Sequence, residues 1–203
     1  MSAVTSVLLA GVGGQGVLLA SEVLAEAAAI AGSDVKKSEV HGMAQRGGSV
    51  VSHLRFGSQV HSPLIPRGGA DFLVSFERLE TLRYLEYLHR GSVVLVNTQE
   101  ILPLPVSVGK ARYPRDVEER LGATGVRALF VDGHGIALAA GNAKAVNAAI
   151  LGALSAILRF DAGVWEEALR RQIPSRLLEV NLRAFALGAA AVGPAGSAAA
   201  PVR

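Results

Sequence analysis

The chain alternates between short apolar runs and longer amphipathic stretches up to about residue 192. Short apolar runs bounded by turn residues predict buried strands, at residues 4–10, 70–76, 92–97 and 127–132. Apolar residues at helical spacing predict helices, at residues 17–31, 77–90 and most of 135–192. Because strands alternate with helices, we expect an α/β fold, an open, mostly parallel Rossmann-like sheet with helices on both faces.

Two features refine this expectation. The Gly57-Ser58 pair between alternating runs predicts one antiparallel hairpin, with a short strand at residues 59–61. The helical stretch 143–157 has an apolar stripe too broad for one contact, so we expect it to be buried on two sides, one of them against a partner. Self-association is therefore expected.

Length and composition indicate one domain. The 203 residues are 50% hydrophobic, enough for a single core, and we assign residues 1–192 to it. Residues 193–203 are a Gly/Ala/Pro tail that we expect to be disordered. The net charge is +3 and the basic residues are scattered, so we expect no nucleic-acid partner.

The sequence also bears on compartment and redox chemistry. It has no cysteine, which excludes disulfides, thiolate nucleophiles and an iron–sulfur cluster held by cysteines of this chain. The N-terminus lacks a basic segment and the first predicted helix carries Glu22 and Glu26, so we expect neither a signal peptide nor a membrane span. We expect a cytoplasmic protein, and we identify no metal site.

The first strand is followed by a glycine turn, Gly11-Val-Gly-Gly-Gln-Gly16, that leads into a helix. Such a turn presents backbone N–H groups and the positive end of the helix dipole, which suit an anion. The acidic residue that would hold a ribose is missing, because Lys36 and Lys37 stand in its place. The turn therefore predicts either a tight connection or an anion site more readily than a nicotinamide dinucleotide. The candidate binding residues here are Gly11, Gly13, Gly14, Gln15 and Gly16.

A second candidate loop lies between two predicted strands, within residues 35–56. His41 is a candidate proton shuttle or hydrogen-bond donor, and Arg46 offers a planar fork for a carboxylate or phosphate; a structural turn histidine and an ion pair with Glu39 are the alternatives. Further candidate binding residues of this loop are Ser38, Gln45 and Gly47. We expect the two loops to leave adjacent strands at one sheet edge and to form a single cleft.

Three stretches carry a resemblance to a known family, at 11–28 (Gly-Val-Gly-Gly-Gln-Gly-Val-Leu-Leu-Ala-Ser-Glu-Val-Leu-Ala-Glu-Ala-Ala), 37–57 (Lys-Ser-Glu-Val-His-Gly-Met-Ala-Gln-Arg-Gly-Gly-Ser-Val-Val-Ser-His-Leu-Arg-Phe-Gly) and 141–147 (Gly-Asn-Ala-Lys-Ala-Val-Asn). They resemble the gamma-type domain of 2-oxoacid:ferredoxin oxidoreductases, above all the beta subunits of the indolepyruvate enzymes. The resemblance runs from about residue 4 to 190.

The resemblance implies a subunit of a heteromeric enzyme that oxidatively decarboxylates 2-oxoacids, in particular aryl pyruvates, to acyl-CoA. It places thiamine diphosphate and the 4Fe-4S clusters on a larger alpha subunit, with coenzyme A as co-substrate and ferredoxin as electron acceptor. It implies that this chain alone holds none of these cofactors.

Two other interpretations stay open at this point. One is a stand-alone module of the same fold that binds a nucleotide or flavin. The other is an NADP-dependent reductase in which Lys36 or Lys37 holds a 2′-phosphate.

We predict that the purified chain, free of any partner, oxidises no 2-oxoacid, because it has no cysteine to carry an iron–sulfur cluster. Assays with a 2-oxoacid, coenzyme A and an artificial electron acceptor check this. Turnover by the isolated chain would contradict it.

Overall fold

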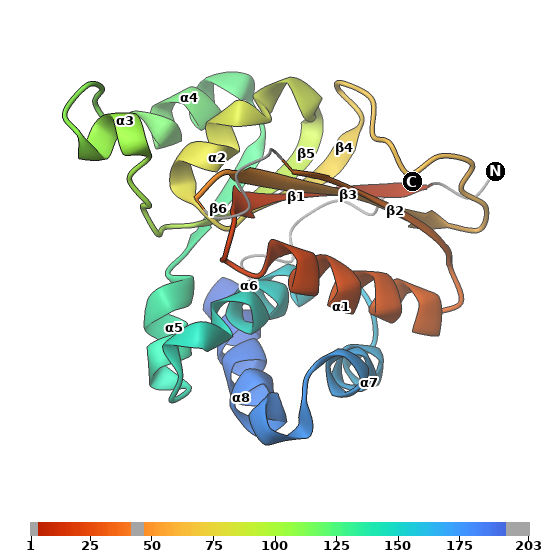
Figure 1. Ribbon diagram of the computed structural model, residues 1–203. Helices are drawn as coiled ribbons and strands as arrows, with labels where there is room; N and C mark the ends of the chain where they lie inside the picture. Colours follow the sequence, from red (N-terminus) through yellow and green to blue (C-terminus); the bar gives the residue numbers. More distant parts are fainter. Residues whose placement is uncertain (1–3, 42–46, 194–203) are drawn as a thin grey trace.

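The computed structural model describes residues 4–41 and 47–193, without the side chain of His41. Helices cover both faces of a central sheet (Figure 1), so the predicted α/β class is confirmed. The strands are β1 Thr5–Val12, β2 Asp34–His41, β3 Ser49–Gly57, β4 Ala70–Ser75, β5 Leu88–Asn97 and β6 Arg127–Val131.

The sheet has the strand order β2-β3-β1-β4-β5-β6. β1, β4, β5 and β6 are parallel to one another, whereas β3 is antiparallel to both β1 and β2. β1 is buried along nearly its whole length, as expected for a central strand covered on both faces.

The predicted hairpin is wrong in its position. The antiparallel hairpin is formed by β2 and β3, with the register Asp34↔Gly57 to His41↔Val50, while residues 59–61 form no strand. Asp34 explains part of this, because its carboxylate accepts a hydrogen bond from the Val60 N–H (2.8 Å) that a strand would have used.

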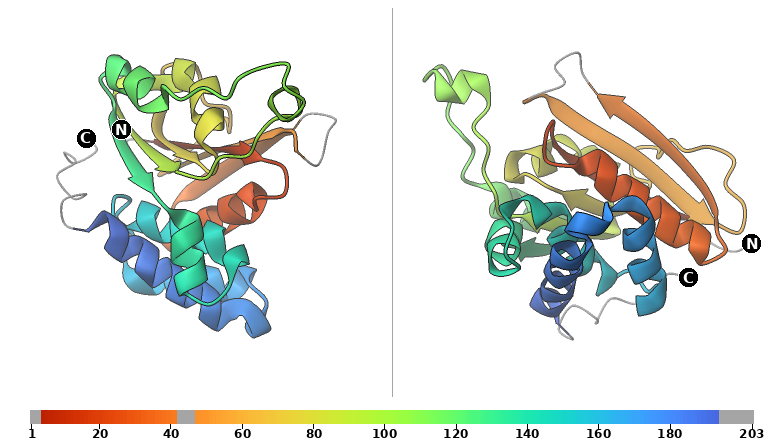
Figure 2. Two further views of the ribbon diagram at one scale, coloured as in Figure 1. Left: turned by 90° about the vertical axis from the view of Figure 1, so that its left-hand side faces the viewer. Right: turned by 60° about the horizontal axis from the view of Figure 1, so that its bottom comes forward.

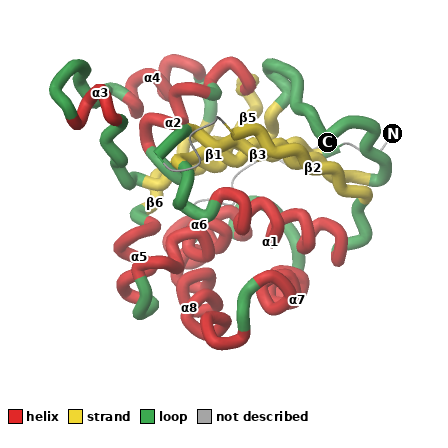
Figure 3. Tube along the Cα trace, viewed as in Figure 1, coloured by secondary structure: helices red, strands yellow, loops and turns green. Residues whose placement is uncertain are grey.

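One sheet face is covered by α1 Val17–Ile30 and by the C-terminal helices, and the other by shorter elements (Figure 3). The first group also contains α5 Gly133–Ala139, α6 Val146–Ser155, α7 Ala162–Gln172 and α8 Ser175–Val192, with a 3-10 turn at Ala143–Ala145. The second contains α2 Arg78–Arg83, a 3-10 turn at Leu85–Tyr87 and α4 Val117–Thr124, and α3 Leu104–Ser107 projects beside them (Figure 1). Within the described residues, no helix has the length and apolar composition needed to cross a bilayer.

The predicted helix at residues 77–90 is too long. It breaks into α2 and the 3-10 turn, and Leu88 begins β5 by pairing with Ala70. The apolar spacing that suggested one helix is present in the sequence, but its last residue, Leu88, pairs in the sheet instead.

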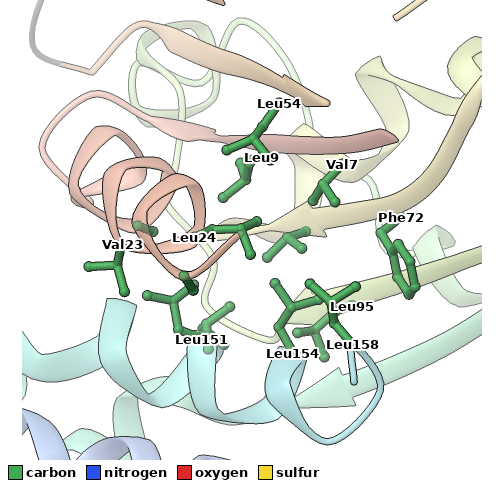
Figure 4. Close-up of a cluster of buried hydrophobic side chains, with 14 of the residues drawn as sticks. Val7, Leu9, Val23, Leu24, Leu54, Phe72, Leu95, Leu151, Leu154 and Leu158 are labelled. Carbon is green, nitrogen blue, oxygen red and sulfur yellow. The ribbon is translucent and has the colours of Figure 1, made fainter. Parts of the chain in front are cut away.

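The larger core lies between the sheet and α1, α6 and α7. Leu9 and Leu54 from the sheet meet Leu24 of α1 and Leu151 and Leu154 of α6 in Figure 4. All five side chains are fully buried, and burying each contributes about 1.5–3 kcal/mol.

α6 is buried on two sides, as expected, but the second side is covered by α8 of the same chain and not by a partner. The two helices touch through their backbones, because a Cβ added to Gly152 would lie 1.9 Å from the Phe185 carbonyl oxygen and one added to Gly188 would lie 1.9 Å from that of Ala149. The apolar stripe that we expected to drive association is therefore already buried within the chain.

We predict that Gly152→Ala lowers the free energy of unfolding by at least about 1–3 kcal/mol, because the new methyl forces two helix backbones apart. The matched control is Gly122→Ala in α4, where a Cβ would meet nothing within 4 Å, and its stability should stay level or rise by up to about 1 kcal/mol. Urea unfolding of both variants measures the difference. Equal stabilities would contradict the close crossing.

Candidate functional site

The glycine turn joins β1 to α1 and needs its glycines for two different reasons. Gly16 has a φ of 79°, in the left-handed region that favours glycine. At Gly11 the limit is space, because a Cβ would lie 2.7 Å from Val17 Cγ2 and 3.0 Å from Phe76 Cβ. Because both residues are glycines, no side chain of theirs covers the backbone at the start of α1.

The start of α1 lines a pocket of about 510 Å³. Helix geometry leaves the first N–H groups of α1 without intrahelical acceptors, and Gly16 as N-cap has no side chain to cap them. The described part of the lining thus combines the backbone of the glycine turn, including N–H groups at the start of α1, with apolar side chains. The lining residues are Val12, Gly13, Gly14, Gly16, Val17, Leu18 and Val50.

The second candidate loop meets the glycine turn directly. The Gly13 N–H donates to the Gly48 carbonyl (2.8 Å), and the Gly47 N–H donates to the Gly13 carbonyl (3.4 Å). Ser49 pairs with Val12 in the sheet. The predicted meeting of the two loops at one edge is confirmed, although they leave β1 and β2, which are not adjacent because β3 lies between them.

Several predicted residues of this loop lie outside the described residues. They are Gln45 and Arg46, together with the side chain of His41. Both ends of the loop are fixed, since β2 ends at His41 and Gly47 and Gly48 are bonded to the glycine turn.

Gln15 faces into the protein and holds the turn in place. Its Oε1 accepts from the Val12 N–H (2.8 Å), and its Nε2 donates to the Phe76 carbonyl (2.7 Å) and to Gln99 Oε1 (3.2 Å). Asn97 continues the network, donating to the same Phe76 carbonyl (2.9 Å). Side-chain amides thus link the carboxyl ends of β1, β4 and β5.

A buried network that the sequence pattern did not reveal supports the second loop. Ser49 Oγ donates to Glu80 of α2 and lies 3.1 Å from the Tyr84 hydroxyl. Glu80 is only 4% exposed and also accepts from Arg83 Nε (2.8 Å). Burial raises the pKa of Tyr84, so its phenol stays protonated as a donor. Glu80 lies in the predicted helix 77–90, and the approach of Ser49 from a distant strand leaves no local signal in the sequence.

The structure separates Ser38 from the pocket. Ser38 pairs with His53 on the sheet face opposite α1, where the Ile65 N–H donates to His53 Nδ1 (3.2 Å). Burial lowers the pKa of His53, which keeps it neutral and able to accept this bond.

Lys36 and Lys37 both face carboxylates. Lys36 pairs with Asp34, and Lys37 pairs with Glu22 and Glu39. Burial lowers the pKa of Lys37, but the hydrogen bonds with Glu22 and Glu39 outweigh it and leave this pKa above its usual value. These ion pairs argue against a 2′-phosphate site at the two lysines. Glu39, the alternative ion-pair partner considered for Arg46, is paired with Lys37.

The fold and this edge define a class, an α/β domain with a glycine turn and a hairpin loop tied together at the carboxyl ends of its strands. The family model described as "Pyruvate ferredoxin/flavodoxin oxidoreductase" matches residues 6–191. The chain is 40% identical over 191 residues to "Indolepyruvate oxidoreductase subunit IorB" of Thermococcus kodakarensis, an alignment that covers 90% of this chain and 93% of that protein. The chain therefore belongs to the pyruvate ferredoxin/flavodoxin oxidoreductase family.

Solved structures show the same fold. The pyruvate oxidoreductase subunit PORC of Thermotoga maritima matches with a TM-score of 0.69 and 24% identity, over 91% of this chain and 94% of that one. A 2-oxoglutarate:ferredoxin oxidoreductase chain from Magnetococcus marinus, solved with 2-oxoglutarate, coenzyme A and succinyl-CoA bound, matches with a TM-score of 0.75 and 21% identity. That match covers 98% of this chain and 32% of the other, so the same fold forms one part of a longer chain there.

We predict that Gln15→Glu destabilises the isolated chain by about 1–3 kcal/mol, because a carboxylate cannot donate to the Phe76 carbonyl. The exposed Gln59→Glu, which changes the same group, is the control and should leave stability within about 0.5 kcal/mol of the original. Thermal and urea melts measure both. An unchanged melt for Gln15→Glu would show that the side chain is free to face a ligand.

Proposed function

We propose that this chain is the smaller subunit of a thiamine-diphosphate-dependent indolepyruvate:ferredoxin oxidoreductase in the cytoplasm. In this reaction an aryl pyruvate loses carbon dioxide, its acyl group passes to the thiol of coenzyme A, and two electrons pass to ferredoxin. The 40% sequence identity to an indolepyruvate oxidoreductase subunit, over nearly the whole length of both chains, supports this assignment. Residues 1–192 form the working domain in this proposal.

The redox cofactors belong to a larger partner subunit in this proposal. The chain has no cysteine for a 4Fe-4S cluster, and its described residues contain no group of three His, Asp or Glu side chains placed to hold a metal ion. Its residues therefore do not fit the clusters or the metal that accompanies a bound diphosphate. The partner supplies decarboxylation and electron transfer, and this chain supplies binding and positioning.

The observation that carries the proposal is the pair of hydrogen bonds joining Gly13 to Gly47 and Gly48. They hold Gly47 and Gly48 beside the start of α1, and Arg46 is the residue that precedes them in the sequence. Backbone N–H groups, a helix dipole and a guanidinium all favour an anionic group. We infer that this edge binds the anionic end of coenzyme A or of the 2-oxoacid.

The pocket walls suit the rest of such a ligand. Among the described residues, its lining side chains are those of Val12, Val17, Leu18 and Val50, none of them charged. An anionic ligand with an apolar body, such as an aryl pyruvate, matches this combination.

The candidate residues divide into three roles. Gly11, Gly13, Gly14, Gly16 and Gly47 shape the backbone, Arg46 binds the anion, and His41 donates a hydrogen bond or moves a proton at the ligand. Gln15 and Ser38 support the two loops from behind, and Gln45 completes the loop. A stand-alone flavin or nucleotide module would instead purify with a bound chromophore, which absorbance spectra of the isolated chain would reveal.

We predict that Arg46→Lys in the assembled enzyme lowers turnover roughly ten- to a hundredfold, because it keeps the charge but loses the paired hydrogen bonds, worth about 1–3 kcal/mol. Steady-state rates with varied 2-oxoacid and coenzyme A would identify the ligand through the KM that rises.

Arg67→Lys is the matched control, since Arg67 is a surface arginine paired only loosely with Glu86 (3.2 Å). It should turn over like the original enzyme. Gel filtration and melts of the same preparations should show normal assembly for both variants. If Arg46→Lys assembles and turns over normally, the anion role is wrong; if it dissociates but the residual complex is fully active, Arg46 is an architectural residue.

A further inference from the structure

An apolar arm projects from the body of the molecule between β5 and α4. We define the arm as residues 102–112, which contain α3 and stand clear of the other elements in Figure 2 (right). No residue of the arm is buried. Three of its large apolar residues are exposed, Leu102 at 53%, Leu104 at 75% and Val108 at 54%. Such a cluster is costly to leave in water.

The arm has a defined shape without help from the body. The Val108 N–H donates to the Leu104 carbonyl (3.0 Å), so these two side chains lie one helical turn apart on the same face. The Lys110 and Ala111 N–H groups both donate to the Pro105 carbonyl (2.8 and 3.0 Å). An apolar face held ready in this way loses little conformational entropy when it binds.

A buried carboxylate clamps both limbs at the base of the arm. Glu77 is 1% exposed, and its Oε1 accepts from the Ile101 N–H (3.0 Å) on one limb and from the Tyr113 hydroxyl (2.6 Å) on the other. Burial and the hydrogen bond to Glu77 raise the pKa of Tyr113, so the phenol remains the donor. The projection is therefore a fixed part of the fold.

The arm also carries positive charge that this chain does not neutralise. Lys110 and Arg112 are exposed, and neither forms an ion pair with any part of the chain that the structure describes. In a symmetric contact between two copies, the arm would pack against the same patch of the other copy, which would bring cations of like charge together. A different protein, with an apolar groove flanked by carboxylates, fits both features better.

We propose that the arm is the docking element for the larger subunit of the oxidoreductase complex, with Leu104 and Val108 entering an apolar groove and Lys110 and Arg112 facing acidic residues at its rim. This inference rests on the proposed function for the existence of that subunit. It adds which surface of this chain makes the contact.

The test is assembly with the purified larger indolepyruvate oxidoreductase subunit from the same organism. Leu104→Asp combined with Val108→Asp should leave the melting temperature of the free chain unchanged, because both side chains are exposed, and should raise the Kd for the larger subunit about a hundredfold or more. The matched control combines Leu138→Asp and Leu187→Asp, two exposed leucines on α5 and α8, and should bind like the original chain.

The outcomes are distinct. Equal binding by the arm variant and the original chain, or equal losses in the arm variant and the control, would overturn the docking role. If the original chain itself fails to bind the larger subunit, both the proposed function and the docking role of the arm are wrong. If the original chain forms a homodimer that the arm variant abolishes, the occupant is a second copy and the proposal is wrong.

The charge of the rim is tested separately. Lys110→Glu with Arg112→Glu should slow association about tenfold at low salt, with a smaller effect at high salt. Unchanged association rates would rule out the acidic rim.

Discussion

The position of β3 between β1 and β2 is the constraint on which the site depends. β3 pairs with both neighbours along its length, and Ser49 at its start lies opposite Val12 at the end of β1. The hairpin loop and the glycine turn must therefore emerge at the same edge, close enough for Gly13 to bond Gly47 and Gly48. A one-residue slip of β3 would turn Val50 and Leu54 away from the core, so the apolar pattern of the strand also fixes the register of the loop.

Local pattern was sufficient to predict the elements whose neighbours in sequence decide their structure. The apolar run of β1 and the helical spacing of α1 are of this kind, as is the meeting of two loops at one edge. Local pattern failed where contact with a distant segment determines the structure. Leu88 continues a helical spacing but pairs with Ala70, and the side of α6 expected to face a partner is covered by α8. Gln15 was expected at a ligand, and its direction depends on Phe76, sixty-one residues away.

Two buried carboxylates could not be predicted from local sequence either, because the groups that stabilise them come from distant segments. Glu77 and Glu80 lie in the stretch 77–90, which was predicted as one helix from its apolar spacing, and both are buried. An isolated buried carboxylate is costly, and each is stabilised by several donors that arrive from elsewhere, including Ile101 and Tyr113 for Glu77 and Ser49 for Glu80. Such residues are visible only when tertiary structure is known. They hold the peripheral parts of the molecule that the sheet itself does not fix.

The contact between α6 and α8 also has a consequence for how the protein is made. α8 follows α6 and α7 in the sequence, and its Gly188 packs on the backbone of Ala149. During synthesis, the sheet and α6 leave the ribosome before α8 does, so the alanine-rich side of α6 stays uncovered until α8 has been made. Domains generally fold as units, and nascent chains with exposed apolar surface are prone to aggregate. Completion of α8 is thus the step that covers this side of α6.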